Sequence, residues 1–337
     1  MRTIERAHQV EGSRLLEAAR RLAPLIADHA DEAERERRVP KAVVGELVSA
    51  GVFHMFVPRV FGGGEVDVAI GVRVLEELSK ADGSTGWIAM IGATTGLISA
   101  YLPQQVAREI YRPGVITGGV VAPRGTAVPE NGGYRVNGTW SFASGCEHSH
   151  WLACASLVQG SDVPDVRMML FPATAIEIID TWHVSGLRGT GSHDIAVNDA
   201  YVPTDYSFSL AGRPAQSGVL YGFSLIGLLA VSVAAVALGI GRGPRLSEAR
   251  NRRSNSARSC GWRHRRQFRD PCARSMSRTT WGAGRRSTRA AGCSGGFGTS
   301  MPSRNTLWSD RPALRQLGGR CWGMRCRLGF FRDEMTD

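Results

Sequence analysis

The chain has 337 residues, of which 43% are hydrophobic, so it is long enough for about two domains with a buried core. This length and composition exclude a disulfide-stapled miniprotein, a collagen and a wholly disordered chain. The net charge of +11 is distributed unevenly along the chain. Residues 1–241 carry 19 Lys and Arg against 24 Asp and Glu, whereas residues 242–337 carry 22 Arg, no Lys and six acidic residues. A mildly acidic body therefore precedes a very basic C-terminal part.

The N-terminal sequence and the cysteines point to a reducing compartment. Residues 1–6 are charged and lead into no apolar segment, so no secretory signal is expected. The body contains two cysteines, Cys146 and Cys154, which provide no disulfide framework. No second ligand pair at zinc spacing follows Cys146 and Glu147, so no metal site is expected. These features predict a cytoplasmic protein.

Apolar residues recur at helical spacing through the first third of the chain. The predicted helices cover residues 10–36, 40–51, 66–80 and 84–101, and a short helix follows Pro103. The helix over 84–101 is apolar on nearly every side, as in a helix buried inside a bundle. We therefore expect an N-terminal α-helical domain over residues 1–113.

After residue 113 the helical spacing of apolar residues ends. Short runs of β-branched and aromatic residues follow, separated by Gly, Pro, Asn and Asp. These runs predict strands over residues 115–121, 134–136, 140–142, 151–158, 166–171, 176–179 and 194–202. Asn131–Gly133 and Asn137–Gly138 are predicted hairpin turns by composition. We expect an antiparallel β-barrel or sandwich domain over residues 114–212.

Residues 218–241 are apolar almost throughout and long enough to cross a bilayer, and basic residues follow them. A single span after a soluble body would be unusual, and the run is rich in Ala, Gly and Ser. We therefore expect a buried helix, the first of a C-terminal bundle, within residues 213–243. Residues 244–337 contain no Ile, Val or Tyr and show no helical periodicity.

Three segments share a pattern with a known family. They are Gly83–Trp87, Gly132–Gly145 followed by His148 and Trp151, and Asp180–Asp194 followed by Val202 and Pro203. With these segments in order, residues 12–243 resemble the acyl-CoA dehydrogenase superfamily. Within it they are most similar to the oxygenase component of two-component flavin-dependent monooxygenases, which hydroxylate phenols and related aromatics. The resemblance implies an α+β fold with an N-terminal helical domain, a middle antiparallel β-barrel domain that contacts the flavin, and a C-terminal helical bundle, here truncated or frame-disrupted.

The resemblance also implies a flavin site. Ser144 lies where the family places a hydroxyl against the flavin, and Phe142 lies where it places an aromatic beside the ring. The candidate catalytic residues are Ser144 and His148, the latter as a polar group near flavin or substrate. The candidate cofactor-binding residues are Trp140, Phe142, Ser144, Arg188, Gly189, Thr190 and Ser192. From the residues alone, Trp140 as a core aromatic, His148 as a structural histidine and Gly189 as a turn glycine remain open.

The resemblance further implies reduced FMN or FAD as cosubstrate, a flavin reductase that supplies it, a small aromatic substrate and O2. It implies a homo-oligomer in intact homologues, with no membrane association. One alternative function is an acyl-CoA dehydrogenase that oxidises an acyl thioester with FAD. The other is a non-catalytic nucleic-acid-binding protein with a basic tail, which is disfavoured because no zinc-finger spacing or RNA-binding motif is present.

The basic tail, residues 244–337, departs from the family. Its abundance of Arg, Gly, Ser, Cys and Trp is typical of GC-rich coding DNA read out of frame. We hypothesise a frame shift near residues 243–250, and we expect the tail to be disordered or loosely structured. Hydroxylases of the family supply a catalytic histidine from this region, so no catalytic base is predicted here. This chain is then expected to turn over weakly or not at all.

Overall fold

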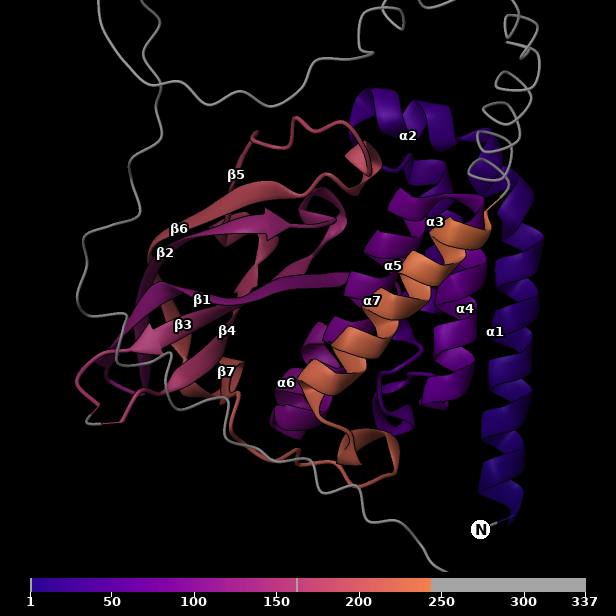
Figure 1. Ribbon diagram of the computed structural model, residues 1–337. Coiled ribbons are helices and arrows are strands. Elements are labelled where there is room, and N and C mark those ends of the chain that lie inside the picture. Colours follow the sequence, from indigo (N-terminus) through magenta and orange to yellow (C-terminus); the bar gives the residue numbers. More distant parts are fainter. Residues whose placement is uncertain (1, 162, 244–337) are drawn as a thin grey trace, which may run out of the picture. The chain divides into compact units, whose positions relative to one another are not determined.

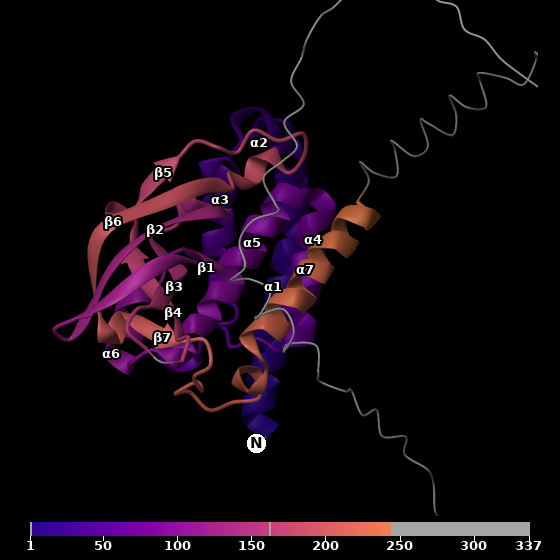
Figure 2. The ribbon, with the colours of Figure 1, turned by 60° about the vertical axis from the view of Figure 1, so that its left-hand side comes forward.

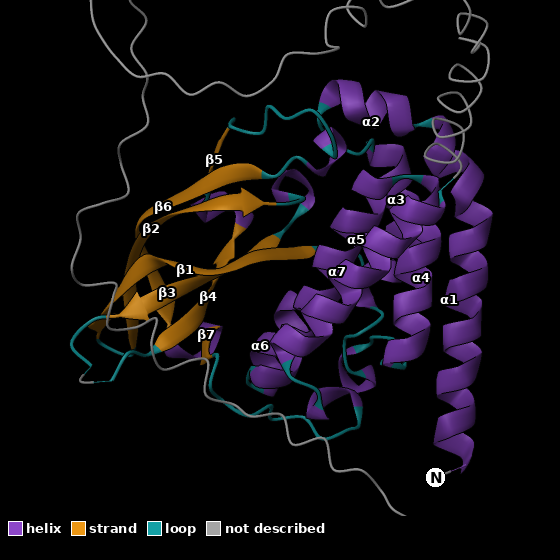
Figure 3. Cartoon of the chain, in the orientation of Figure 1, coloured by secondary structure: helices purple, strands orange, loops and turns teal. Residues whose placement is uncertain are grey.

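The computed structural model describes residues 2–161 and 163–243, and the side chains from Val10 onward. In this part of the chain, helices lie on one side and a single sheet on the other (Figure 1, Figure 3). The α-helices are α1 (Arg2–Asp28), α2 (Ala30–Glu36), α3 (Lys41–Ser49), α4 (Val68–Ala81), α5 (Gly83–Thr95), α6 (Gln104–Ile110) and α7 (Leu225–Arg242). The strands are β1 (Thr117–Glu130), β2 (Gly133–Ala143), β3 (Trp151–Val158), β4 (Val166–Pro172), β5 (Glu177–Ile179), β6 (His193–Pro203) and β7 (Ser207–Ser209). The predicted α+β fold class is confirmed.

Short 3₁₀ turns join these elements. They are η1 (Val52–His54), η2 (Arg59–Phe61), η3 (Gly96–Tyr101), η4 (Cys146–His148), η5 (Ala173–Ala175), η6 (Arg188–Thr190), η7 (Thr204–Tyr206) and η8 (Leu220–Gly222). Two predicted helices are divided by such irregularities. The helix expected over 84–101 continues as η3 after Thr95, and the one expected over 10–36 is interrupted at His29. The ring Nδ1 of His29 lies 2.9 Å from the Leu25 carbonyl, which the backbone N–H of His29 also contacts, so two donors share one acceptor there.

The sheet is open and contains one parallel pair, whereas the sequence predicts an antiparallel barrel or sandwich. Its strand order is β5-β6-β2-β1-β3-β4-β7, with β5 and β7 as open edges. All neighbouring pairs are antiparallel except β1 and β3, which run parallel. The reason is the connection after β2. The chain passes through η4 and returns beside β1, on the side away from β2, so β3 must run in the direction of β1.

The two predicted hairpin turns have different outcomes. Asn131 and Gly132 join β1 to β2, and Gly132 adopts φ +76°, so the first turn is confirmed. The second prediction is wrong, because Asn137 and Gly138 lie inside β2. Gly138 permits close approach instead, since a Cβ there would come within 2.7 Å of the Gly125 Cα. The strands predicted over 134–136 and 140–142 are consequently one strand, and β7 was missed.

Helix α7 packs along one face only. Leu228, Ala235 and Val236 are buried against the helical core, whereas Ile226 and Leu238 are about half exposed. Figure 2 shows α7 lying across α4 and α5 on the outside of the helical layer. The expectation of a buried helix therefore holds for one face. Among the described residues, α7 is the one helix long and apolar enough to cross a membrane by length and composition, a test that core helices of soluble proteins also pass.

Candidate functional site

The start of α5 places an indole beside the sheet. Asp82 ends α4 and caps α5, because its carboxylate accepts hydrogen bonds from both the backbone N–H and the hydroxyl of Thr85, each at 2.8 Å. Gly86 lets the two helices touch, since a Cβ there would lie 2.0 Å from the Ser79 Oγ. The next residue, Trp87, reaches across to the end of β2.

A bulge at the end of β2 turns one aromatic ring outward. The pairing of β2 with β6 shifts register between Trp140 and Ala143. Regular alternation would place the rings of Trp140 and Phe142 on the same face. Instead Trp140 is fully buried, whereas Phe142 adopts φ +65° and is 69% exposed. A positive φ costs a non-glycine residue about 1–2 kcal/mol, so the surrounding structure holds this ring in place.

Two residues after Phe142, Ser144 begins a chain of buried hydroxyl groups. The Trp87 Nε1–H donates to the Ser144 Oγ at 2.9 Å. The Ser144 Oγ lies 2.6 Å from that of Ser192, which lies 2.7 Å from the Thr190 Oγ1. The Thr190 hydroxyl donates to the Leu187 carbonyl at 2.9 Å. The structure therefore brings together three of the residues singled out in the sequence, Ser144, Thr190 and Ser192, all at most 5% exposed.

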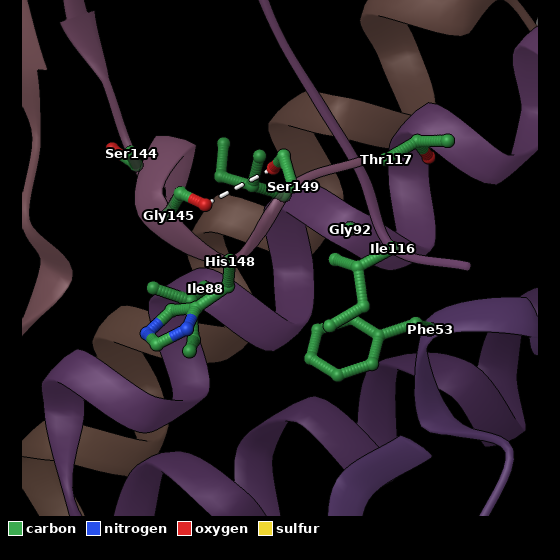
Figure 4. Close-up of a pocket in the computed structure, with 10 residues that line it drawn as sticks. Phe53, Ile88, Gly92, Ile116, Thr117, Ser144, Gly145, His148 and Ser149 are labelled. Atoms are coloured by element: carbon green, nitrogen blue, oxygen red, sulfur yellow. Dashed lines mark hydrogen bonds between the residues drawn. The ribbon is translucent and has the colours of Figure 1, made fainter. Parts of the chain in front are cut away.

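On the helix-facing side of Ser144 is a small, mostly apolar cavity of about 10 Å³ (Figure 4). That volume holds about one water molecule, whereas a cavity that binds benzene measures about 150 Å³. The lining residues include Phe53, Ile88, Ile116, Thr117 and His148. The site as it stands therefore admits a water here and no aromatic ring.

His148 contributes a neutral imidazole to this cavity. Burial, assisted by the positive charges of Arg38 and Lys41, lowers the pKa of His148 to about 4. Its Nε2 is buried and has no hydrogen-bond partner among the described residues. The side chain is thus uncharged near neutral pH and has a free ring nitrogen.

Comparison with known proteins identifies the family. Residues 11–118 match the family described as acyl-CoA dehydrogenase, N-terminal domain. The FADH(2)-dependent resorcinol hydroxylase, oxygenase component, of Rhizobium sp. (strain MTP-10005) is 37% identical over 186 residues, which are 54% of this chain and 46% of that protein. The crystal structure of the HsaA monooxygenase from M. tuberculosis superimposes with a TM-score of 0.68 at 30% identity and covers 73% of this chain and 68% of that one. The chain belongs to the acyl-CoA dehydrogenase superfamily, in the branch of flavin-dependent monooxygenase oxygenase components.

Two further comparisons bear on extent and ligand. The flavin-dependent monooxygenase oxygenase subunit HsaA of Mycobacterium tuberculosis (strain ATCC 25618 / H37Rv) is 35% identical over 198 residues, 58% of this chain and 50% of that protein. XiaF from Streptomyces sp., solved in complex with FADH2 and glycerol, has a TM-score of 0.65 at 29% identity and covers 72% of this chain and 64% of that one. The chain thus spans about half the length of the curated relatives it matches.

The residues at the end of β2 fit the flavin that this family implies. A flavin ring needs a flat apolar neighbour and a polar group at its edge. Phe142 offers an exposed ring that the fold holds outward, and the Ser144 hydroxyl follows two residues later. Trp182 supports the Phe142 ring in an edge-to-face contact with centroids 6.1 Å apart.

The remaining predicted cofactor residues bond within the protein. Trp140 donates its Nε1–H to the Ala155 carbonyl at 2.7 Å inside the sheet core. The Arg188 guanidinium donates to the carbonyls of Glu34 and Val184. Gly189 lets η6 approach α2, because a Cβ there would lie 2.9 Å from that of Ala33. Ligand contact from this segment would therefore have to use its backbone.

Charged pairs fix the loop that ends in the hydroxyl chain. Arg37, after α2, makes two hydrogen bonds to the Asp180 carboxylate, at 2.5 and 2.8 Å. The hydrogen bond from Arg37 lowers the pKa of Asp180 to about 2. Arg38 pairs with Glu147 at 3.2 Å. Within residues 10–161 and 163–243, no group of three His, Cys, Asp or Glu side chains is placed to hold a metal ion.

Sequence reasoning missed two members of the site, Trp87 and Trp182. Both lie within the family segments quoted from the sequence, so the signal was present. Their roles depend on partners far along the chain, since Trp87 and Ser144 are separated by 57 residues.

Proposed function

We propose that this protein is the oxygenase component of a two-component monooxygenase, which hydroxylates a small aromatic substrate with reduced FMN or FAD and O2. The observation that supports it best is the outward Phe142 ring beside the buried Ser144 hydroxyl, in a chain of this family. Named relatives include a resorcinol hydroxylase and indole-3-acetate monooxygenases. Reduced flavin would supply the two electrons with which one oxygen atom of O2 enters the ring and the other leaves as water.

The chain's own residues would bind and shield the flavin. In this proposal Phe142 lies against the flat ring, and Ser144 hydrogen-bonds its N5 edge. Trp87 and Ser192 hold the Ser144 hydroxyl in place. His148 would offer a neutral nitrogen on the substrate side, and backbone groups of Arg188–Ser192 would meet the remaining polar atoms of the cofactor.

The partners follow from the reaction. A separate flavin reductase would supply the reduced flavin, since nothing in the described part of the chain resembles a nicotinamide-binding domain. We further propose a cytoplasmic protein that forms a homo-oligomer.

The test is a reaction with chemically reduced flavin. The protein is mixed anaerobically with reduced FMN or FAD and then exposed to isotopically labelled O2 with resorcinol, other phenols or indole-3-acetate. Any hydroxylated product that forms should contain one labelled oxygen atom by mass spectrometry. Oxidised flavin without a reductant is the control and should give no product. Failure to bind reduced flavin, or bleaching of bound FAD by an acyl-CoA, would contradict the proposal.

A further inference from the structure

We propose that the hydroxyl chain that begins at Ser144 has a fixed direction, which leaves Ser144 as a hydrogen-bond acceptor, and that this direction is what lets the site distinguish reduced from oxidised flavin. Ser192, Thr190 and Trp87 are then positioning residues that set the selectivity through Ser144. The inference rests on the proposed function, because it takes the Ser144 hydroxyl to meet the N5 edge of the flavin.

The direction follows from the last member of the chain. A carbonyl oxygen can only accept, so the single proton of the Thr190 hydroxyl points to the Leu187 carbonyl, 2.9 Å away. Thr190 must then accept from Ser192 across their 2.7 Å contact. Because Ser192 donates its own proton to Thr190, it must accept a hydrogen bond from Ser144 across their 2.6 Å contact. Each hydroxyl has one proton, so fixing the last bond fixes the others.

The first member of the chain agrees with this direction, although the Thr190–Leu187 contact alone sets it. The Trp87 indole nitrogen has a hydrogen and no lone pair to offer, so it donates to the Ser144 Oγ. Ser144 therefore gives its proton to Ser192, receives one from Trp87 and keeps one free lone pair. It has no proton left for a ligand.

The reverse direction is disfavoured by the Leu187 carbonyl. It would turn the Thr190 proton toward Ser192 and leave two oxygens facing each other at 2.9 Å without a hydrogen between them. Thr190 is 2% exposed, so water cannot relieve that contact. The Leu187 carbonyl also accepts from the Thr190 N–H and the Trp182 Nε1–H. Neither of these bonds places a hydrogen between the Thr190 Oγ1 and the carbonyl oxygen.

This polarity discriminates between the two redox states of a flavin. N5 of reduced flavin has a hydrogen and is a donor, whereas N5 of oxidised flavin has only a lone pair. An acceptor at Ser144 pairs with the first and repels the second. One hydrogen bond, made in one state and replaced by a mismatch in the other, corresponds to about a tenfold difference in affinity.

The test measures the dissociation constants of the full chain for reduced and for oxidised FMN, by anaerobic titration. The quantity of interest is the ratio of the oxidised to the reduced constant. Ser192→Ala removes the group that takes the Ser144 proton, so Ser144 becomes able to donate, and the ratio should fall about tenfold with tighter binding of oxidised FMN. Thr190→Val should act in the same direction, because Ser192 then turns its proton to Ser144.

Two controls distinguish a change in hydrogen-bond direction from the general effect of removing a buried hydroxyl. Ser99→Ala removes another buried hydroxyl that donates to a carbonyl, in η3 outside the chain of hydroxyls, and should leave the ratio unchanged. In a Ser144→Ala background, Ser192→Ala should no longer change the ratio. Circular dichroism and thermal melting confirm that each variant is folded.

The outcomes distinguish the inference from the function on which it rests. If both flavin forms bind and neither Ser192→Ala nor Thr190→Val changes the ratio, the directional chain is wrong while the proposed function stands. If the ratio changes equally in the Ser144→Ala background, the effect does not pass through Ser144, and the inference is also wrong. If neither flavin form binds the wild-type chain, the proposed function is wrong and the inference falls with it.

Discussion

His148 is a titratable side chain whose surroundings disfavour its charged form. Its pKa is about 4 in the folded chain against an ordinary 6.5, so between these values the unfolded chain binds a proton that the folded chain does not. Stability should therefore fall as pH drops from about 6.5 to 4, by up to about 3 kcal/mol from this residue. The measurement is the free energy of unfolding in urea across this range, for the wild type and His148→Gln.

The variant isolates this one histidine. His148→Gln should lose less stability on acidification than the wild type, because it has no group to titrate there. His183→Gln is the matched control, since that imidazole is exposed. Parallel pH profiles for the wild type and His148→Gln would show that His148 does not disfavour its charge.

Ser144 is the residue on which the proposed chemistry depends most directly. Ser144→Ala should speed the release of hydrogen peroxide several-fold after the flavin-loaded protein meets O2, because the flavin edge loses its polar partner. The rate of peroxide release is measured in a single turnover, with Ser99→Ala as the control for loss of a buried hydroxyl. An unchanged rate in a folded Ser144→Ala protein would remove Ser144 from the chemistry.

The contact between α4 and α5 positions Trp87, and one glycine determines it. A Cβ at Gly86 would lie 2.7 Å from the Ser79 Cβ and 2.8 Å from its Cα, so backbone and not only a flexible side chain must move. Gly86→Ala should lower the free energy of unfolding by about 1–3 kcal/mol, although alanine is the better helix former.

Another helical glycine provides the control. Gly45 lies in α3, and no described residue has an atom within 4 Å of the position that a Cβ would take there, so Gly45→Ala should gain up to about 1 kcal/mol in urea unfolding. Gly86→Ala should also weaken binding of reduced FMN, because it shifts the neighbouring Trp87. Equal stability changes at the two positions would mean that the α4–α5 contact is not tight.

The elements themselves were largely predictable, for reasons that also explain the errors. Helical periodicity predicted a helix over residues 40–51, close to the observed α3, because that signal is local. Asn137 and Gly138 gave a false turn, since the same residues serve here as a side-chain acceptor for the Asp199 N–H and as a point of close approach. Composition does not distinguish a turn from a crowded strand.

The site was predictable only in part. The family resemblance gave Phe142 and Ser144, but the bulge that exposes Phe142 arises from pairing with β6, which follows much later in the chain. The partners of Ser144 likewise come from α5 and from the segment before β6, at separations of 57 and 48 residues. Such groups meet only when the tertiary fold is complete, so no local pattern could assign their hydrogen bonds.

For the molecule as a whole, the helical layer and the sheet are joined at the site. Trp87 bonds to Ser144, Arg37 pairs with Asp180, and Arg38 pairs with Glu147, so contacts between the two layers involve Ser144 and the segments that follow β2 and precede β6. The expectations for residues 244–337, disorder and a shifted reading frame, lie outside the described residues and stay predictions.

This chain should therefore bind reduced flavin even though its hydroxylation is weak or absent. Phe142, Ser144 and the hydroxyl chain all lie before residue 244, so reduced flavin should bind. The match to the curated relatives covers only about half of their length, and the basic tail has no Ile, Val or Tyr to build the helices that the family resemblance implies. Hydroxylation should consequently be weak or absent.

If the frame hypothesis is right, the nucleotide sequence after codon 243 encodes amphipathic helices in another frame, and a chain translated in that frame hydroxylates at least about tenfold faster at similar flavin affinity. Turnover by the present chain equal to that of the frame-corrected one, or the lack of helical periodicity in both other frames, would contradict this prediction.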